Sequence, residues 1–178
     1  MLRWALESNR PVAIRYARGG IVCGEPLGRC ARVALGKGEL LQDGQDVGIL
    51  ALGSIVYPAL EAAARLKGQG IEAAVANARF VKPLDRALIR QVATRTEALV
   101  TVEEAQVAGG FGSAVAEALE ALDLPRVSLH RIGLPDQFVE QGTRAQLLSL
   151  CQLDAEGLAR RIAPWLNALK VPAEDVRC

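Results

Sequence analysis

Apolar and polar positions alternate in a regular order along the chain from Gly38 onward. Four short runs are expected as strands, at 47–52, 71–75, 98–102 and 127–132, and the most apolar of them are typical of strands buried on both faces. Between the runs, apolar residues recur every three or four positions, as at Leu88, Ile89 and Val92, which predicts amphipathic helices. This alternation favours a three-layer α/β fold, with a mostly parallel sheet of about five strands between helices.

A fifth strand is expected at 39–41, just before the first buried run. Asp43-Gly44 lies between the two and is a typical hairpin turn, so 39–41 is predicted to be an antiparallel edge strand. Ser54 and Asp85 are each placed to cap a following helix. The last two helices are expected near 143–151 and 155–168, with Pro164 either kinking the second or beginning a separate turn.

The beginning of the chain does not fit this alternation. Residues 4–6 resemble the tail of a helix and 11–16 a short strand, and two such elements cannot bury their own apolar faces. Glycine and proline then accumulate, as is typical of a loop or linker. We therefore expect four parts: the remnant of a preceding domain at 1–20, a linker at 21–36, the main domain at 37–170 and a frayed tail at 171–178.

Composition and charge narrow the class of protein. Apolar residues make up 51% of the chain and charged residues 23%, as in ordinary folded proteins. The formal net charge is only +1, which argues against a partner such as nucleic acid or a membrane surface. No signal-peptide pattern and no apolar run of about 20 residues occurs, so a cytoplasmic location is expected.

Cysteine and histidine are too scattered to suggest a metal site. The four cysteines are Cys23, Cys30, Cys151 and Cys178, without a CxxC pair, and His130 is the sole histidine. Zinc sites need clustered ligands of these types. Free thiols and a packed histidine are therefore the expected roles.

Two acidic residues and a glycine-rich stretch are the next candidates for a functional site. Gly109-Gly110-Phe111-Gly112 opens a predicted helix, whose backbone N–H groups are suited to an anion, but the spacing matches no phosphate-binding motif and favours a tight structural turn. Glu103 and Glu104 end a predicted strand, where neighbouring side chains point to opposite faces. They are therefore not expected to form a converging acid–base pair.

Two arginines lie where a loop leaves a predicted strand, at Arg18 and Arg79. Such strand-end loops are where α/β folds place ligands, and a guanidinium binds phosphate through two parallel hydrogen bonds. Most surface arginines are merely solvated, so the residues alone leave both interpretations open.

Several motifs in fixed order resemble the 1-deoxy-D-xylulose-5-phosphate synthases, which are relatives of transketolase. The most specific are Asn-Ala-Arg-Phe-Val-Lys-Pro-Leu-Asp at 77–85 and Gly-Gly-Phe-Gly-Ser-Ala-Val at 109–115. The others are Gly-Glu-Pro-Leu at 24–27, Leu-Gly-Lys-Gly at 35–38, Ile-Leu-Ala-Leu-Gly-Ser at 49–54, Val-Glu-Glu at 102–104, Gly-Leu-Pro-Asp at 133–136 and Leu-Asp-Ala-Glu-Gly at 153–157. The resemblance implies a fold like the transketolase C-terminal domain, preceded by the end of a pyrimidine-binding domain.

The resemblance also implies an activity. The complete enzyme would condense pyruvate with D-glyceraldehyde 3-phosphate and release carbon dioxide, supplying isoprenoid, thiamine and pyridoxal biosynthesis. It would use thiamine diphosphate and magnesium, both bound mainly by preceding domains, so this chain alone is expected to bind neither and to be inactive. The rest of the synthase chain and a second subunit of a homodimer would be its partners.

Residue by residue, the family's substrate-phosphate arginines fall on Arg18 and Arg79, with Tyr16 beside the first. The family usually has Tyr-Pro-Arg-Gly, whereas this chain has Ala17 in place of the proline. Without the fixed backbone dihedral of proline, the direction of the Arg18 side chain would be less well defined. Two other interpretations stay open: an independent binding or regulatory module, and one half of a split transketolase-like enzyme.

Overall fold

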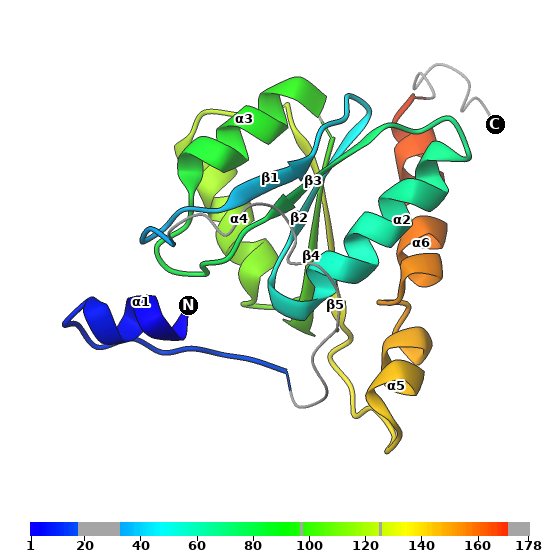
Figure 1. Ribbon diagram of the computed structural model, residues 1–178. Coiled ribbons are helices and arrows are strands. Elements are labelled where there is room, and N and C mark those ends of the chain that lie inside the picture. The colour runs from blue at the N-terminus through cyan, green and yellow to red at the C-terminus, as the bar shows by residue number, and fades with distance from the viewer. Residues whose placement is uncertain (18–32, 97, 125, 171–178) are drawn as a thin grey trace.

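The computed structural model describes residues 1–17, 33–96, 98–124 and 126–170. A five-stranded sheet forms its centre (Figure 1). The spatial order is β1 (Glu39–Gln42), β3 (Ala73–Asn77), β2 (Val47–Ala51), β4 (Ala98–Gln106) and β5 (Ser128–Leu134). All neighbouring pairs are parallel except β1 with β3. The predicted mostly parallel sheet with one antiparallel edge strand is confirmed.

The predicted hairpin between β1 and β2 is wrong, because β1 pairs with β3 instead. Glu39 lies opposite Asn77 and Leu40 opposite Ala76. The connection crosses the start of β3, where the N–H groups of Gln45 and Asp46 donate to the Glu72 carbonyl at 3.1 and 2.9 Å. Every residue of β2 is buried, whereas every residue of β1 is only partly buried. The apolar strand therefore takes the interior place between β3 and β4, and the short β1 takes the edge.

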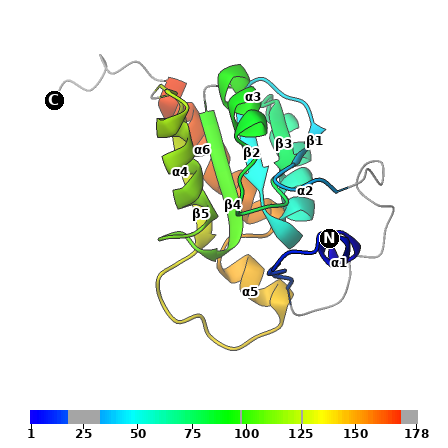
Figure 2. The same ribbon diagram turned by 90° about the vertical axis from the view of Figure 1, so that its left-hand side faces the viewer.

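Two helices cover each face of the sheet (Figures 1 and 2). One face carries α2 (Val56–Lys67) and α6 (Ala155–Lys170), and the other carries α3 (Arg86–Thr96) and α4 (Phe111–Ala121). Neighbouring strand residues point to opposite faces. Ile49 and Val100 accordingly pack in the core on the α2 and α6 side, while Leu50 and Leu99 pack on the α3 and α4 side.

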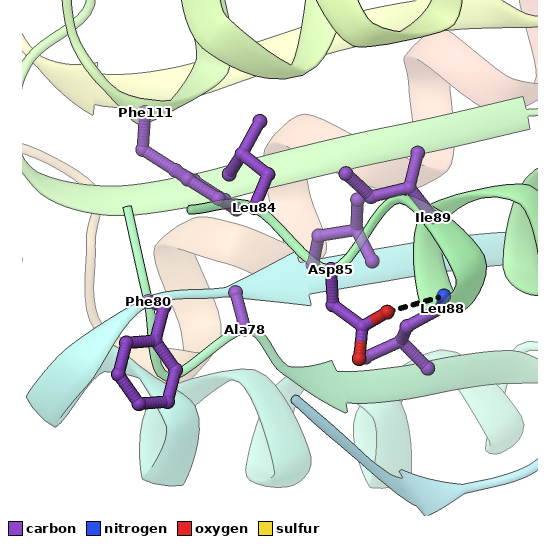
Figure 3. Close-up of a pocket in the computed structure, with 8 residues that line it drawn as sticks. Ala78, Phe80, Leu84, Asp85, Leu88, Ile89 and Phe111 are labelled. Atoms are coloured by element: carbon purple, nitrogen blue, oxygen red, sulfur yellow. Dashed lines mark hydrogen bonds between the residues drawn. The ribbon is translucent and has the colours of Figure 1, made fainter. Parts of the chain in front are cut away.

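The helix caps follow the sequence only in part. The carboxylate of Asp85 accepts from the Leu88 N–H at 3.1 Å, so the predicted cap of α3 is confirmed (Figure 3). Ser54 is not a cap: it lies inside a 3-10 turn, η1 (Gly53–Ile55), which precedes α2. Its hydroxyl donates to a carboxylate on β4 and is therefore not available to the helix. Pro58 lies in the first turn of α2, where proline is tolerated.

The last two helices are found close to their expected places. α5 (Arg144–Leu150) is short, and Thr143 and Gln146 close its N-terminus with a reciprocal capping box. α6 runs through Pro164 to Lys170, so no separate turn begins at the proline. No helix among the described residues combines the length and apolarity needed to cross a bilayer.

The first seventeen residues lie beside the sheet rather than in it (Figure 1). α1 (Leu2–Glu7) confirms the expected helix, but it buries none of its residues. The strand expected at 11–16 is wrong, since this segment joins no strand of the sheet and has no regular structure. Its contacts are made by side chains: the Trp4 ring meets the Phe80 ring edge-on at 5.5 Å, and Arg15 reaches β4.

Candidate functional site

The candidate site is the edge of the sheet where the parallel strands end. β2, β3, β4 and β5 all finish there, and several polar contacts lie at this edge. α1 and α5 lie at the same end of the molecule (Figures 1 and 2). Ligands in α/β folds bind at this edge, because the loops leave the strands without crossing the helical layers.

Arg79 follows β3 and is held in an unusual conformation. Its φ of 58° lies in the left-handed region, which is uncommon for residues other than glycine. The side-chain oxygen of Asn77 accepts from the Arg79 N–H at 3.1 Å and stabilises the turn. The Arg79 guanidinium forms an ion pair with Glu39 of β1, and only 18% of the side chain is exposed. The arginine is therefore a fixed side chain with a carboxylate partner.

The other two predicted site residues lie at the end of the N-terminal segment. Tyr16 is 86% exposed, and Arg18 lies outside the described residues. Among the described residues, no hydrogen bond joins Tyr16 to Arg79. The structure thus describes Tyr16 and Arg79 as two separate features of the molecule.

Glu103 faces the helical layer of α4 and is buried. Its two carboxylate oxygens accept from the N–H groups of Phe111 and Gly112, at 2.7 and 2.8 Å. These donors are the free N–H groups of the first turn of α4, which otherwise attract an anion. The glycine-rich stretch is accordingly the tight structural turn that its spacing favoured, and the chain fills the anion position itself.

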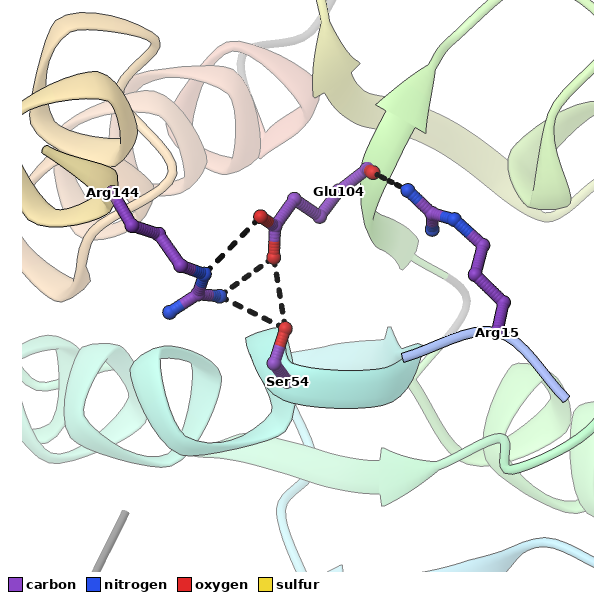
Figure 4. A network of polar contacts seen from close by, with 4 residues as sticks. All are labelled: Arg15, Ser54, Glu104 and Arg144. Carbon is purple, nitrogen blue, oxygen red and sulfur yellow. Dashed lines mark hydrogen bonds and ion pairs between the residues drawn. The ribbon is translucent and has the colours of Figure 1, made fainter. Parts of the chain in front are cut away.

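Glu104 faces the other way and forms a polar cluster with two side chains (Figure 4). Its carboxylate accepts from the Ser54 hydroxyl at 2.8 Å and from Arg144 at 2.6 and 3.2 Å. Arg144 also donates to Ser54 at 2.9 Å. The Glu104 carbonyl accepts from the Arg15 guanidinium at 2.5 Å. This cluster of Ser54, Glu104 and Arg144, here called the Glu104 cluster, joins η1, β4 and α5 to the N-terminal segment.

The charges around Glu104 keep its carboxylate ionised. Burial by itself raises the pKa, but hydrogen bonds from Arg144 and Ser54 and the positive charges of Arg144 and Arg15 outweigh burial. The pKa of Glu104 therefore lies below the ordinary glutamate value.

Sequence reasoning expected Glu103 and Glu104 on opposite faces, and this is confirmed. It missed Arg144 altogether and assigned Ser54 to a cap. The spacing of Thr143 and Gln146 was the available signal for Arg144, because a capping box fixes where α5 begins and therefore which side chain lies at its first position.

His130 and Cys151 play packing roles. The His130 ring stacks on Trp165 with centroids 5.2 Å apart and an interplanar angle of 22°. Burial and the charge of Arg161 lower the pKa of His130, which favours the neutral ring. Cys151 has a free, half-buried thiol, and the other three cysteines lie outside the described residues.

The described part of the chain holds no metal cluster, and the small cavity in its core is not a ligand site. No three side chains of His, Cys, Asp or Glu gather there in an arrangement able to hold a metal ion. A cavity of about 10 Å³ lies beside Asp85, lined otherwise by apolar side chains such as Phe80 and Phe111 (Figure 3). This volume is about that of one water molecule, so it is a packing defect and not a ligand site.

The fold and this strand-end edge define the class of protein, and the family match agrees with them. Residues 36–158 match the model of the transketolase C-terminal domain. The chain belongs to the transketolase C-terminal domain family.

Among curated proteins, the chain is similar to one particular kind of transketolase relative. The chain is 48% identical to 1-deoxy-D-xylulose-5-phosphate synthase 1 of Geobacter sulfurreducens over 97% of its own length and 27% of that protein. It is 48% identical to the synthase of Acidovorax sp. strain JS42 over 95% of its length and 26% of that protein. The chain thus spans about a quarter of the length of these relatives, and the matches confirm the resemblance seen in its motifs.

Solved structures agree with the fold. A split-gene transketolase, in the form of an inactive β4 tetramer, is 40% identical with a TM-score of 0.71, over 76% of this chain and 44% of that one. A transketolase of Pichia stipitis is 22% identical with a TM-score of 0.51, over 75% of this chain and 18% of that one, and supports the fold alone.

Proposed function

We propose that this chain is the C-terminal portion of a 1-deoxy-D-xylulose-5-phosphate synthase. The complete enzyme condenses pyruvate with D-glyceraldehyde 3-phosphate, releases carbon dioxide and leaves 1-deoxy-D-xylulose 5-phosphate. The observation that carries the proposal is the 48% identity to a synthase over 97% of the chain. We place the complete enzyme in the cytoplasm, as a homodimer to whose subunit contact this domain contributes.

The residues described here do not fit the cofactors of such an enzyme. Thiamine diphosphate needs donors for its diphosphate and magnesium needs oxygen ligands. The first-turn N–H groups of α4 are occupied by Glu103, and no described group of three metal-binding side chains occurs. We therefore propose that both cofactors bind to the remainder of the enzyme and that this chain holds neither.

We propose that this chain also binds the acceptor's phosphate. Arg79 supports this assignment because it lies at the strand-end edge with its backbone fixed by Asn77. A fixed guanidinium suits a doubly charged phosphate. We propose Arg79, Arg18 and Tyr16 as the substrate-binding residues of the complete enzyme, where the phosphate would share the Arg79 guanidinium with Glu39.

A chimeric synthase tests the function directly. Residues 1–178 would replace the matching C-terminal part of the Geobacter sulfurreducens synthase, and product formation and carbon dioxide release would be measured. We expect turnover by the chimera and none by the isolated 178-residue chain under the same conditions. A folded chimera without turnover, or turnover by the isolated chain, would contradict the proposal.

The same chimera tests Arg79. Replacing it with alanine removes a charge-assisted contact worth about 1.5–3 kcal/mol, which corresponds to a loss of roughly ten- to a hundredfold in kcat/KM for the phosphorylated acceptor. The KM for pyruvate should change little. Glu39→Gln is the matched variant, since it frees the guanidinium and should not weaken phosphate binding.

Unphosphorylated glyceraldehyde is the control acceptor. If Arg79→Ala reduces turnover of glyceraldehyde as strongly as that of glyceraldehyde 3-phosphate, Arg79 supports the fold and does not bind phosphate.

A second candidate function is one half of a split transketolase-like enzyme. The 40% identity to a split-gene transketolase favours it. The two candidates differ in where the catalytic domains are encoded. The reading frame upstream of the Met1 codon distinguishes them, because a synthase continues through it and a split enzyme places those domains in a separate gene.

A further inference from the structure

The N-terminal segment has few means of keeping its place on the domain. α1 buries no residue, and residues 11–17 join no strand. Within residues 11–17, a side-chain hydrogen bond to the domain runs from Arg15, the neighbour of Tyr16, to the Glu104 carbonyl. The position of Tyr16 therefore depends on how firmly Arg15 is held.

The acceptor for Arg15 belongs to a rigid group of elements. Glu104 is fixed through its carboxylate by Ser54 of η1 and Arg144 of α5, with distances of 2.6–3.2 Å. Arg144 is the first residue of α5 and lies between Thr143 and Gln146, the two residues of the capping box, so its backbone is also fixed. Three side chains from three elements thus hold in place the backbone carbonyl that receives Arg15 (Figure 4).

The charge balance of the cluster favours the same arrangement. Glu104 carries one negative charge, and Arg144 and Arg15 bring two positive charges to it. The attraction between Arg15 and Glu104 contributes to the low pKa of that carboxylate, after the larger effects of burial and of the bonds from Arg144 and Ser54. Arg15 is therefore attracted to the Glu104 carboxylate as well as bonded to its carbonyl.

Arg15 and Tyr16 are neighbours with different surroundings. The Arg15 guanidinium reaches the domain, whereas Tyr16 is 86% exposed. Releasing Arg15 would leave the direction of Tyr16 undetermined.

We propose that the Glu104 cluster is the seat that positions Tyr16 by holding Arg15. Arg15, Glu104, Ser54 and Arg144 are then positioning residues and not substrate ligands. The link to substrate binding rests on the proposed function, whereas the seating of the segment does not.

Nuclear magnetic resonance of the isotopically labelled 178-residue chain tests the seating. Heteronuclear relaxation reports ps–ns motion of the backbone at residues 12–17, and the Arg15 Nη–H signals report its hydrogen bond to the Glu104 carbonyl. In the native chain, we expect an ordered segment and a slowly exchanging Arg15 signal. Arg15→Ala and Glu104→Gln should make residues 12–17 move like a flexible tail, and Arg15→Lys should restore part of the order.

Glu140→Gln is the matched control, because it removes one exposed carboxylate from the loop before α5. It should leave the relaxation of residues 12–17 unchanged. Equal mobility of residues 12–17 in the native chain and in Arg15→Ala would overturn the proposal.

The chimeric synthase tests whether holding Arg15 affects binding of the phosphorylated acceptor. Arg15→Ala should raise the KM for glyceraldehyde 3-phosphate about three- to tenfold, with kcat and the KM for pyruvate nearly unchanged. If the segment is released in the relaxation experiment while this KM stays constant, the positioning role is overturned. Turnover by the parent chimera is measured separately, so failure of the proposed function is recognised independently.

Discussion

At the scale of single residues, two neighbouring glutamates on β4 have different roles. Glu103 lies in the core and holds the first turn of α4, while Glu104 lies at the strand-end edge and holds α5 and the N-terminal segment. Strand geometry determines this division, because adjacent side chains face opposite layers. Substitutions at the two positions should therefore have separable effects.

Glu103→Ala should destabilise the domain by about 3 kcal/mol. The reason is that two N–H groups lose a charged acceptor and stay buried. Glu103→Gln should cost less, because its carbonyl oxygen still accepts one bond. Urea unfolding of the chain measures both variants. Glu120→Ala, at an exposed position of the same helix, is the control and should differ from the native chain by less than about 0.5 kcal/mol.

The Glu104 cluster predicts a specific dependence on pH. The pKa of Glu104 is lower in the folded state, so its contribution to stability is complete above the unfolded glutamate pKa of about 4.3. The contribution is lost as the pH falls through the lower folded pKa. The free energy of unfolding should therefore differ between the native chain and Glu104→Gln at pH 7, and this difference should shrink toward pH 3. A difference that grows on acidification would refute the ion pair.

At the scale of elements, the sequence predicted which strands and helices occur better than it predicted which strands pair with each other. The apolar runs correctly indicated β2 to β4, and the apolar spacing at Leu88, Ile89 and Val92 indicated α3. The partner of β1 depends on which strand occupies the interior, which is decided by tertiary packing and not by the Asp43-Gly44 turn. The strand expected at 11–16 failed because none of the five strands of the sheet pairs with it.

The same limit applies to the candidate site. Arg79 was found as a strand-end arginine, but its pairing with Glu39 joins two strands that the hairpin prediction had kept apart. The Glu104 cluster joins residues 50 and 90 positions apart in sequence, which no local pattern reveals. The division of the chain near residues 20 and 36, and the roles of Arg18 and Tyr16, stay predictions.

The approach of α3 to the sheet depends on Gly48 of β2. A Cβ atom at this position would lie 2.3 Å from Val92 Cγ1 and 2.7 Å from Leu99 Cδ2. Gly48→Ala should therefore destabilise the chain by about 1–3 kcal/mol, because it forces the helix from the sheet. Combining it with Val92→Ala should cost less than the sum of the single changes. Strictly additive losses in urea unfolding would show that Val92 is not the obstacle.

At the scale of the whole molecule, we expect a domain that folds cooperatively and an N-terminal segment that is only lightly attached to it. We expect slow amide hydrogen exchange in the strands and helices between residues 36 and 168, and fast exchange at residues 1–17. The hydrogen bond of the Arg15 side chain should not slow this exchange, because it does not involve the backbone N–H groups of residues 11–17, which lie outside the sheet. Strong protection at Val12–Tyr16 in the monomer would contradict this description, and measurement at several concentrations separates it from pairing between copies.

The carboxylate of Glu103 at the start of α4 has a consequence for the choice of ligand. A dissolved anion that approaches this helix meets donors that are already bonded within the same chain. Displacing a tethered carboxylate requires an anion to compete with a group held permanently at high local concentration. Inorganic phosphate and nucleotides are therefore expected to gain nothing from the start of α4, because Glu103 already occupies its donors.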